Sequence, residues 1–271
     1  EDVRENICQQ MYDVLSKNKI DYLKWDFNRN ISDAGSALLP PDRKKEFFHR
    51  FILGTYEIMD RLTKAFPNIL FENCSGGGGR FDPAMLYYSP QIWASDNTDP
   101  IERLYIQFGT SMCYPSSSMG AHVSACDRTG YKTKGNVALW GTFGYELDPL
   151  KLTDSDREII REQVKLYHNT YDLIRNGDLY RLVSPFENPY RAVWEIVSPD
   201  KSRAMLTVVT MRGECAPHTI VKLRGLEPQR YYRNEKTGET YSGALLMNAG
   251  LNLTYTANND GDSELLIFTA I

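Results

Sequence analysis

The feature that most restricts the fold of this 271-residue chain is a change of pattern near residue 178. Before it, short apolar runs alternate with amphipathic stretches whose apolar residues recur every three to four positions. After it, short runs rich in β-branched and aromatic residues are separated by turn-forming residues. Alternating strands and helices imply a parallel sheet covered by helices. The sequence therefore predicts an α/β part over 1–177 and a small antiparallel β domain over 178–271.

The expected elements follow from these patterns. In the first part, strands are expected at 20–25, 69–71, 91–94, 119–123 and 142–145, and helices at 3–17, 44–66, 100–108 and 154–175. Asp82 followed by Pro83 indicates the start of a further helix. In the second part, strands are expected at 179–183, 190–197, 204–211, 218–223, 251–256 and 264–269, with a hairpin loop at 234–238 and a tight turn at 259–261 joining the last two.

Composition narrows the range of partners. Lys and Arg form no cluster and the formal net charge is -4, so neither a nucleic acid nor a membrane surface is an expected partner. No apolar run approaches the roughly 20 residues that span a bilayer. The five cysteines and four histidines show no zinc-ligand spacing, so no metal is expected. Reduced thiols in a cytoplasm are the simplest interpretation of the scattered cysteines.

Two aspartates stand where the alternation predicts strand ends. Asp26 follows the apolar run at 21–25, and Asp96 follows the run at 91–95. In a parallel barrel the carboxyl ends of the strands meet on one face, where active sites lie. A pair of carboxyl groups there suits glycoside hydrolysis. Each aspartate could equally cap a following helix or turn, so the residues around them have to decide.

The surroundings favour a sugar site. Lys24 lies two positions before Asp26 and so points to the same side of a strand. Trp25 and Trp93 add aromatic surfaces of the kind on which sugars pack, although both could be core residues. Four glycines at 76–79 would let backbone N–H groups approach a ligand. No Gly-Lys-Ser/Thr follows them, which excludes a Walker A loop but leaves a phosphate-binding nest as an alternative.

Four segments together resemble the motifs of glycoside hydrolase family 36, in the order in which that family has them. They are Tyr22–Arg29, Cys74–Asp82, Trp93–Asp99 and Tyr114–Ser124. The similarity runs from about residue 3 to 175 and continues more weakly through the β domain. The 70 positions between Asp26 and Asp96 also fit the family's layout.

The resemblance implies a fold and a mechanism. The chain would be the C-terminal part of a (β/α)8 TIM barrel followed by a small antiparallel β-sandwich domain. It would belong to a retaining α-galactosidase that works by double displacement on α-galactoside sugars. Asp26 would be the nucleophile and Asp96 the acid/base, with the carboxyl groups roughly 5–5.5 Å apart and the pKa of the acid above that of the nucleophile.

The resemblance also implies a substrate site. Lys24 would hydrogen-bond galactose hydroxyls, and Trp93 would pack beside the sugar. Cys74, Ser75 and Gly77 would line its C2 side, where a bulky side chain would collide with the ring. The adjoining motif residues Trp25, Asn28 and Gly76 are predicted to contact substrate as well, whereas Arg80 and Asp82 would be braces or ligands. No metal or organic cofactor is implied, and the full-length enzyme is expected to be a homo-oligomer.

The chain also departs from the family. The family's earlier barrel strands, which carry a Trp-Asp-Asp motif for the galactose 4- and 6-hydroxyls, and its N-terminal β domain do not occur in these 271 residues. The chain is therefore expected to begin partway through a larger protein and to have little or no activity alone.

Other functions stay open at this point. One is hydrolysis of α-N-acetylgalactosaminides or galactosyl transfer among raffinose-type sugars; small residues at Cys74 and Ser75 argue against an N-acetyl group. Another is a non-catalytic carbohydrate-binding or scaffold fragment that uses Tyr231, Tyr232, Tyr241 and Tyr255 of the β domain. A third is a phosphate-binding half-barrel.

Overall fold

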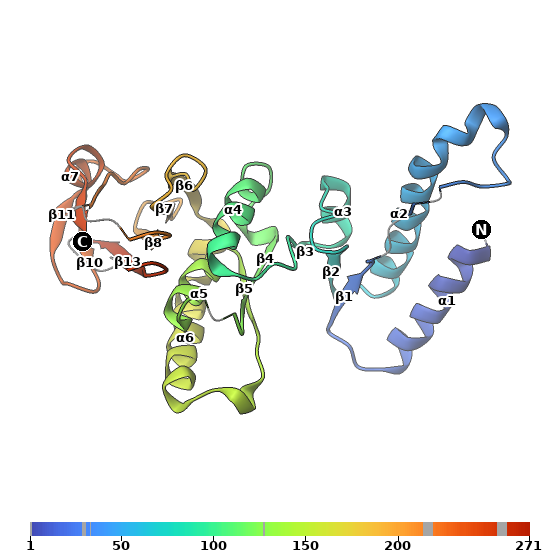
Figure 1. The fold of residues 1–271 in the computed structure, drawn as a ribbon, viewed down its shortest axis with the longest axis horizontal. Helices are drawn as coiled ribbons and strands as arrows, with labels where there is room; N and C mark the ends of the chain where they lie inside the picture. The colour runs from blue at the N-terminus through green and yellow to red at the C-terminus, as the bar shows by residue number, and fades with distance from the viewer. Residues whose placement is uncertain (1, 29–30, 33, 127, 214–218, 254–258) are drawn as a thin grey trace. The chain divides into compact units, whose positions relative to one another are not determined.

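The computed structural model describes residues 2–28, 31–32, 34–126, 128–213, 219–253 and 259–271 (Figure 1). Its contacts divide the chain into two compact units, Glu1–Asp96 and Asn97–Ile271. This division by contacts does not test the domain boundary expected after residue 177, which stays a prediction.

Three parallel strands organise the first unit. Along the chain it contains α1 (Asp2–Lys17), β1 (Tyr22–Asp26), η1 (Pro41–Glu46), α2 (Phe47–Ala65), β2 (Leu70–Cys74), α3 (Pro83–Tyr88) and β3 (Gln91–Trp93). β2 lies between β1 and β3, with Asp26 opposite Cys74 and Asn73 opposite Ile92. Because parallel strands run the same way, the ends of all three lie at one edge of the sheet.

Helices cover one face of these strands. Leu23 and Trp25 of β1 and Phe71 of β2 alternate with polar residues and point to the helical side, where they pack against α1 and α2. The centre of this cluster consists of Cys8, Leu15, Ile58, Met59, Leu62, Phe71, Met85 and Ile92. The alternate positions of the same strands, which include Lys24 and Asp26, therefore point to the opposite face.

The second unit begins with a pair of parallel strands and their helices. It contains α4 (Pro100–Ser111), η2 (Ser116–Ser118), β4 (Met119–Ser124), α5 (Tyr131–Ala138), β5 (Thr142–Glu146), η3 (Pro149–Lys151) and α6 (Asp154–Asn176). β4 pairs with β5 in a parallel register that sets Gly120 opposite Thr142. A capping box between Thr153 and Asp156 starts α6, and Gly177 ends it.

The β domain has two antiparallel sheets. The larger has the strand order β11 (Thr240–Ser242), β10 (Tyr231–Asn234), β13 (Ser263–Ala270), β8 (Arg203–Thr210), β7 (Arg191–Val197) and β6 (Asp178–Val183). The smaller pairs β9 (Thr219–Val221) with β12 (Leu251–Leu253), and α7 (Gly243–Asn248) lies between β11 and β12 in the chain. Apolar side chains from both sheets and α7 form one core, and the other face of the larger sheet packs on α6.

Most expected elements are present with shifted ends. β1 and β2 extend through Asp26 and Cys74, so these two residues belong to strands rather than following them. The helix expected over 44–66 begins at Phe47, after the 3-10 turn η1. The helices α5 and α7 are not among the expected elements. The hairpin expected around 259–261 is wrong: the turn exists, but β12 pairs with β9 and β13 with β8 and β10. Two pieces of the expected strands lie outside the described residues: His218 and residues 254–256, which include Tyr255.

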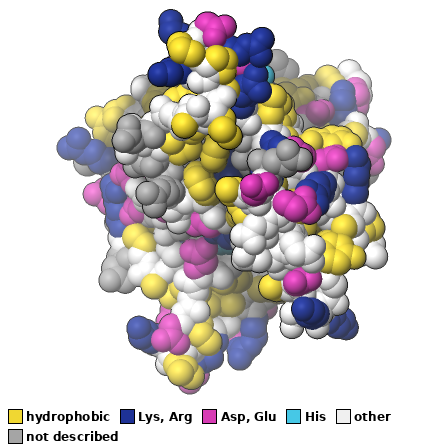
Figure 2. All heavy atoms as spheres, turned by 90° about the vertical axis from the view of Figure 1, so that its right-hand side faces the viewer, with side chains coloured by type: hydrophobic (Ala, Val, Ile, Leu, Met, Phe, Trp, Pro, Cys, Tyr) yellow, Lys and Arg dark blue, Asp and Glu magenta, His cyan; other side chains and the backbone are white. Residues whose placement is uncertain are grey.

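The surface carries charges of both signs. Figure 2 shows basic and acidic side chains intermingled with apolar ones on the face that it presents. Among the described residues, no helix is long and apolar enough to cross a membrane.

Candidate active site

Asp26 ends β1 as an exposed carboxylate with several donors. Asn28 Nδ2 donates a 2.8 Å hydrogen bond to Asp26 Oδ2. Partial burial would raise the pKa of Asp26, but hydrogen bonds from Asn28, the Cys74 thiol and the Phe27 N–H act the other way. Together with the charge of Lys24 they hold the pKa of Asp26 below its usual value. Asp26 is therefore ionised over the neutral and mildly acidic range.

Lys24 lies on the same side of β1 and is held by two neighbours. Its Nζ is 3.8 Å from Glu72 Oε1 and 4.7 Å from the centroid of the Trp93 ring. Glu72 is 1% exposed, and its other oxygen accepts a 2.8 Å bond from Gln91 Nε2. A buried carboxylate is stable only when it is paired, so Glu72 fixes the ammonium group at this place.

Asp96 follows β3 and is attached to it by Trp93. Trp93 is 2% exposed, and its Nε1–H donates a 3.0 Å hydrogen bond to Asp96 Oδ1. An indole N–H has a single proton to give, so this bond sets which way the exposed Asp96 carboxyl group points. Trp93 is a core residue that also orients a candidate catalytic group.

The glycine loop uses its own N–H groups. The N–H of Gly76 donates 2.7 Å to Asn28 Oδ1, and that of Gly77 donates to the thiol of Cys74. The N–H groups of Ser75 and Gly79 bond carbonyls within the loop, at 2.9 and 3.2 Å. A phosphate nest needs several N–H groups that converge on open space. This geometry argues against the phosphate-binding half-barrel.

Backbone packing explains the glycines. Gly76 and Gly77 have φ of +52° and +82°, which side chains disfavour. A Cβ at Gly77 would lie 2.7 Å from Ser95 Cα, and one at Gly78 would lie 2.8 Å from Ala94 O. The loop therefore rests directly on the segment that leads to Asp96. This close approach, rather than the room needed for a sugar, already requires glycine at Gly77.

Side chains brace the two strand ends. Arg80 Nη2 donates 2.8 Å to the Cys74 carbonyl, and its guanidinium group lies 5.1 Å from the centroid of the Phe27 ring. Asp82 caps α3 and accepts a 3.1 Å bond from the Tyr56 hydroxyl. Arg80 therefore ties the end of β2 to Phe27, and Asp82 ties α3 to α2.

Most of the predicted site residues come together at this edge. The bonds and contacts described above link nine of them: Lys24, Asp26, Asn28, Cys74, Ser75, Gly76, Gly77, Trp93 and Asp96. The Ser75 hydroxyl donates 2.8 Å to the Phe27 carbonyl. Trp25 is the exception, because it packs on the helical side with the α1–α2 cluster. The structure does not bring Trp25 to the two carboxylates.

Sequence reasoning missed Glu72 and Phe27. Glu72 is two residues before Cys74 and therefore on the same side of β2, but its partnership with Lys24 depends on the register between β1 and β2. Phe27 contributes its backbone and a ring face for Arg80. Within the described part of the chain, no group of three His, Cys, Asp or Glu residues is arranged to hold a metal.

Comparison with known proteins gives the family. The sequence model of the Melibiase family matches residues 1–177, and that of the glycosyl hydrolase family 36 C-terminal domain matches residues 191–268. Alpha-galactosidase AgaA of Geobacillus stearothermophilus is 47% identical over 266 residues, which is 96% of this chain and 36% of that protein. The chain thus spans about a third of the length of this relative.

Solved structures agree with this assignment. Variants of AgaA in complex with raffinose and with stachyose superpose with TM-scores of 0.96 and 0.95, each at 45% identity and covering 100% of this chain and 38% of theirs. Sequence, fold and the arrangement of the motifs lead to one conclusion. The chain belongs to the α-galactosidases of glycoside hydrolase family 36.

Proposed function

We propose that Asp26 and Asp96 are the nucleophile and the acid/base of a retaining α-galactosidase. The proposal rests on the position of both carboxyl groups at the C-terminal ends of parallel strands of one sheet. There, hydrogen bonds keep Asp26 ionised, and the indole N–H of Trp93 orients Asp96. Asp26 would attack C1 of galactose while Asp96 protonates the departing glycosidic oxygen. Asp96 would then take a proton from water, whose oxygen attacks C1 and releases Asp26.

Two features of the relatives support this pair. AgaA was captured with raffinose and with stachyose, both α-galactosides, in variants that each lack one aspartate. Those aspartates occupy positions 478 and 548 of AgaA and so lie 70 residues apart, as do Asp26 and Asp96. Raffinose-type sugars are the substrates we propose.

The neighbouring residues would position the sugar. Lys24, fixed by Glu72, would hydrogen-bond galactose hydroxyls. Cys74, Ser75, Gly76 and Gly77 would line the sugar's C2 side, and Asn28 would hold both Asp26 and the loop. Cys74 would have to remain a reduced thiol, because a disulfide has no S–H to donate to Asp26. A reducing compartment such as the cytoplasm suits this role.

We also propose that residues 1–177 are the C-terminal part of a (β/α)8 barrel and that the isolated chain has little activity. Asp26 and Asp96 are both exposed, and β1 is an outer strand of its sheet. Electrostatic catalysis needs a site from which water is excluded. The 271-residue chain should therefore hydrolyse p-nitrophenyl-α-galactoside only weakly, and clear turnover by it would contradict this part of the proposal.

The roles of the two aspartates can be separated by azide rescue in a full-length family 36 enzyme that carries this sequence. Asp26→Asn should lose nearly all activity and, with azide, release the β-galactosyl azide. Asp96→Asn should release the α-azide instead, through the intact nucleophile. Asp60→Asn, on the outside of α2, is the control and should behave as the parent. If Asp26→Asn released the α-azide and Asp96→Asn the β-azide, the two roles would be exchanged.

Substrate choice needs its own assay. A panel of nitrophenyl glycosides should show α-galactoside cleaved and α-N-acetylgalactosaminide left intact. The reason is that the Cys74–Gly77 turn is closed by internal hydrogen bonds and cannot widen for an N-acetyl group without breaking them. Preference for the N-acetyl sugar would favour the alternative substrate.

A further inference from the structure

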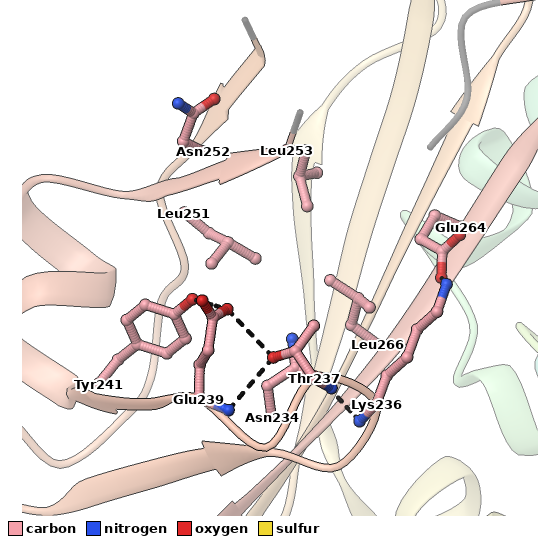
Figure 3. A pocket seen from close by; sticks show the side chains of 10 residues that line it. All are labelled: Asn234, Lys236, Thr237, Glu239, Tyr241, Leu251, Asn252, Leu253, Glu264 and Leu266. Carbon is pink, nitrogen blue, oxygen red and sulfur yellow. Dashed lines mark hydrogen bonds and ion pairs between the residues drawn. The ribbon is translucent and has the colours of Figure 1, made fainter. Parts of the chain in front are cut away.

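A cavity lies in the β domain, within the second unit. It has a volume of about 180 Å³ and opens between β12 and the hairpin formed by β10 and β11 (Figure 3). Its walls come from segments far apart in the sequence: the hairpin, β12 and β13.

One wall of this cavity is apolar. Leu251 and Leu253 point from β12 into the cavity, whereas Asn252 between them points away (Figure 3). Leu266 of β13 faces them from the larger sheet. Leu251 and Leu266 are each 5% exposed and belong to the core of the β domain. The wall is therefore an edge of that core, and Leu253 is its more exposed part.

The other wall presents fixed oxygen atoms. The Tyr241 hydroxyl donates 2.6 Å to Glu239 Oε2, and the Thr237 hydroxyl donates 3.1 Å to the same oxygen. These two bonds lower the pKa of Glu239, so the carboxylate stays ionised at neutral pH. Both bonds go to Oε2 of Glu239, and neither involves its Oε1. Glu239 thus offers a preoriented acceptor at the rim.

The charges at the cavity balance. Lys236 Nζ lies 2.5 Å from Glu264 Oε1, and Lys132 Nζ lies 3.2 Å from Glu264 Oε2. Glu264 is 3% exposed, so this ion-paired group is part of the wall rather than of the open surface. Both lysines are directed to Glu264, and the second negative charge, on Glu239, brings the formal charge of these four groups to zero.

We propose that this cavity binds one pyranose ring of a neutral sugar. A pyranose has an apolar C–H face and hydroxyl groups around its edge, which match a leucine wall and an oxygen-bearing wall on opposite sides of one slot. Its hydroxyls would donate to Glu239 Oε1 and exchange hydrogen bonds with Thr237. The site would give the β domain a sugar-binding role that is independent of Asp26 and Asp96.

The test is a titration of the whole 271-residue chain followed by amide NMR. Galactose and raffinose should shift the signals of Thr237, Glu239, Leu251 and Leu253, with a dissociation constant on the order of 1 mM. Signals of residues 24–28 report the proposed active site separately. If only those move, the cavity proposal fails and the catalytic one is untouched. Shifts confined to the cavity signals support the cavity proposal, and the roles of Asp26 and Asp96 are then decided by the azide rescue in the full-length enzyme.

Three variants sharpen the result. Glu239→Ala should weaken binding at the cavity at least tenfold, because a charged hydrogen-bond acceptor is lost. Glu235→Ala, in the same hairpin but outside the cavity, should change nothing. Leu253→Trp fills the slot and should abolish the cavity shifts while leaving the rest of the spectrum folded.

Two other ligands test the chemistry. Cyclohexanol has the ring without the hydroxyl edge, and sulfate has the charge without the ring. Neither should shift the cavity signals at the concentrations at which galactose does. Binding of cyclohexanol in preference to sugar would reduce the cavity to a plain apolar hole, and binding of sulfate would show an anion site; either result overturns the proposal.

Discussion

The ammonium group of Lys24 lies 4.7 Å from the centroid of the Trp93 ring. This contact connects the two candidate catalytic groups: the charge of Lys24 lowers the pKa of Asp26, and the indole N–H of Trp93 donates to Asp96. A cation over an indole face is an attractive arrangement. A change at Lys24 should therefore affect both carboxyl groups, although Asp96 lies 72 positions away in the chain.

Lys24→Met keeps the length of the side chain and removes its charge. In a full-length family 36 enzyme carrying this sequence, kcat/KM for p-nitrophenyl-α-galactoside should fall roughly tenfold, or ~1.4 kcal/mol. Lys24→Arg keeps the cation and should retain more activity than Lys24→Met. Equal activity of Lys24→Met and the parent would show that the Lys24–Trp93 contact has no catalytic effect.

Asn28→Ala should move the acidic limb of the pH profile. Asn28 donates to Asp26, and its loss removes one of the groups that lower the pKa of that carboxylate. The nucleophile acts only when ionised, so the acidic limb of kcat/KM should move to higher pH in the variant. Asn68→Ala, in an exposed turn, is the matched control and should leave the profile in place. If the acidic limb of Asn28→Ala stays at the pH of the parent, the hydrogen bond from Asn28 does not lower the pKa of Asp26.

Gly77→Ala should destabilise the first unit by about 2 kcal/mol or more. The new Cβ would require a side chain at positive φ and lie 2.7 Å from Ser95 Cα. Denaturant unfolding of the 271-residue chain measures the effect. Gly109→Ala is the control, because a Cβ there meets nothing within 4 Å in α4 and should stabilise the helix by about 0.5–1 kcal/mol. Similar stability of both variants would contradict the packing described for the loop.

Glu195 should make the stability of the β domain depend on pH. It is fully buried in β7, and burial raises its pKa from 4.5 to about 8, although the Arg224 N–H bonds it at 2.8 Å. A raised pKa favours the folded state below pH 4.5, and this contribution is lost as the pH rises to about 8. The unfolding free energy should fall over that range by at most about 1.4 kcal/mol per pH unit.

Glu195→Gln should remove this slope, because the amide resembles the protonated acid and does not titrate. Glu162→Gln, on the exposed side of α6, should keep it. Unfolding curves of the three chains between pH 5 and 8 make the comparison, and parallel slopes for all three would refute the assignment to Glu195.

Local signals explain which elements were predictable. The helix α6 has a capping box and an apolar stripe, both visible in the sequence. The helix α5 has neither: Thr133 to Ala138 are all buried, so no polar face alternates with an apolar one. Its Gly and β-branched residues are weak helix formers, and tertiary packing decides its conformation. The pairing of β9 with β12 joins segments about 30 residues apart and leaves no local trace.

The same distinction applies to the site. The positions of Asp26 and Asp96 could be predicted because each depends on where one strand ends. The partnership of Lys24 with Glu72 could not, because it depends on the register of two strands. The resemblance predicts that Trp25 contacts the sugar, but strand alternation places its side chain on the other face of β1 from Lys24. Its packing with the helices follows from that alternation.

The position of β1 has a consequence for handling the protein. β1 ends the strand order of its sheet, so the amide and carbonyl groups on its outer side face no strand within the described residues. Such an edge is a template on which another chain can add by backbone pairing. Its amides should exchange hydrogen with solvent faster than those of β2. Self-association of the chain through this strand would bury the carboxylate of Asp26 in the aggregate.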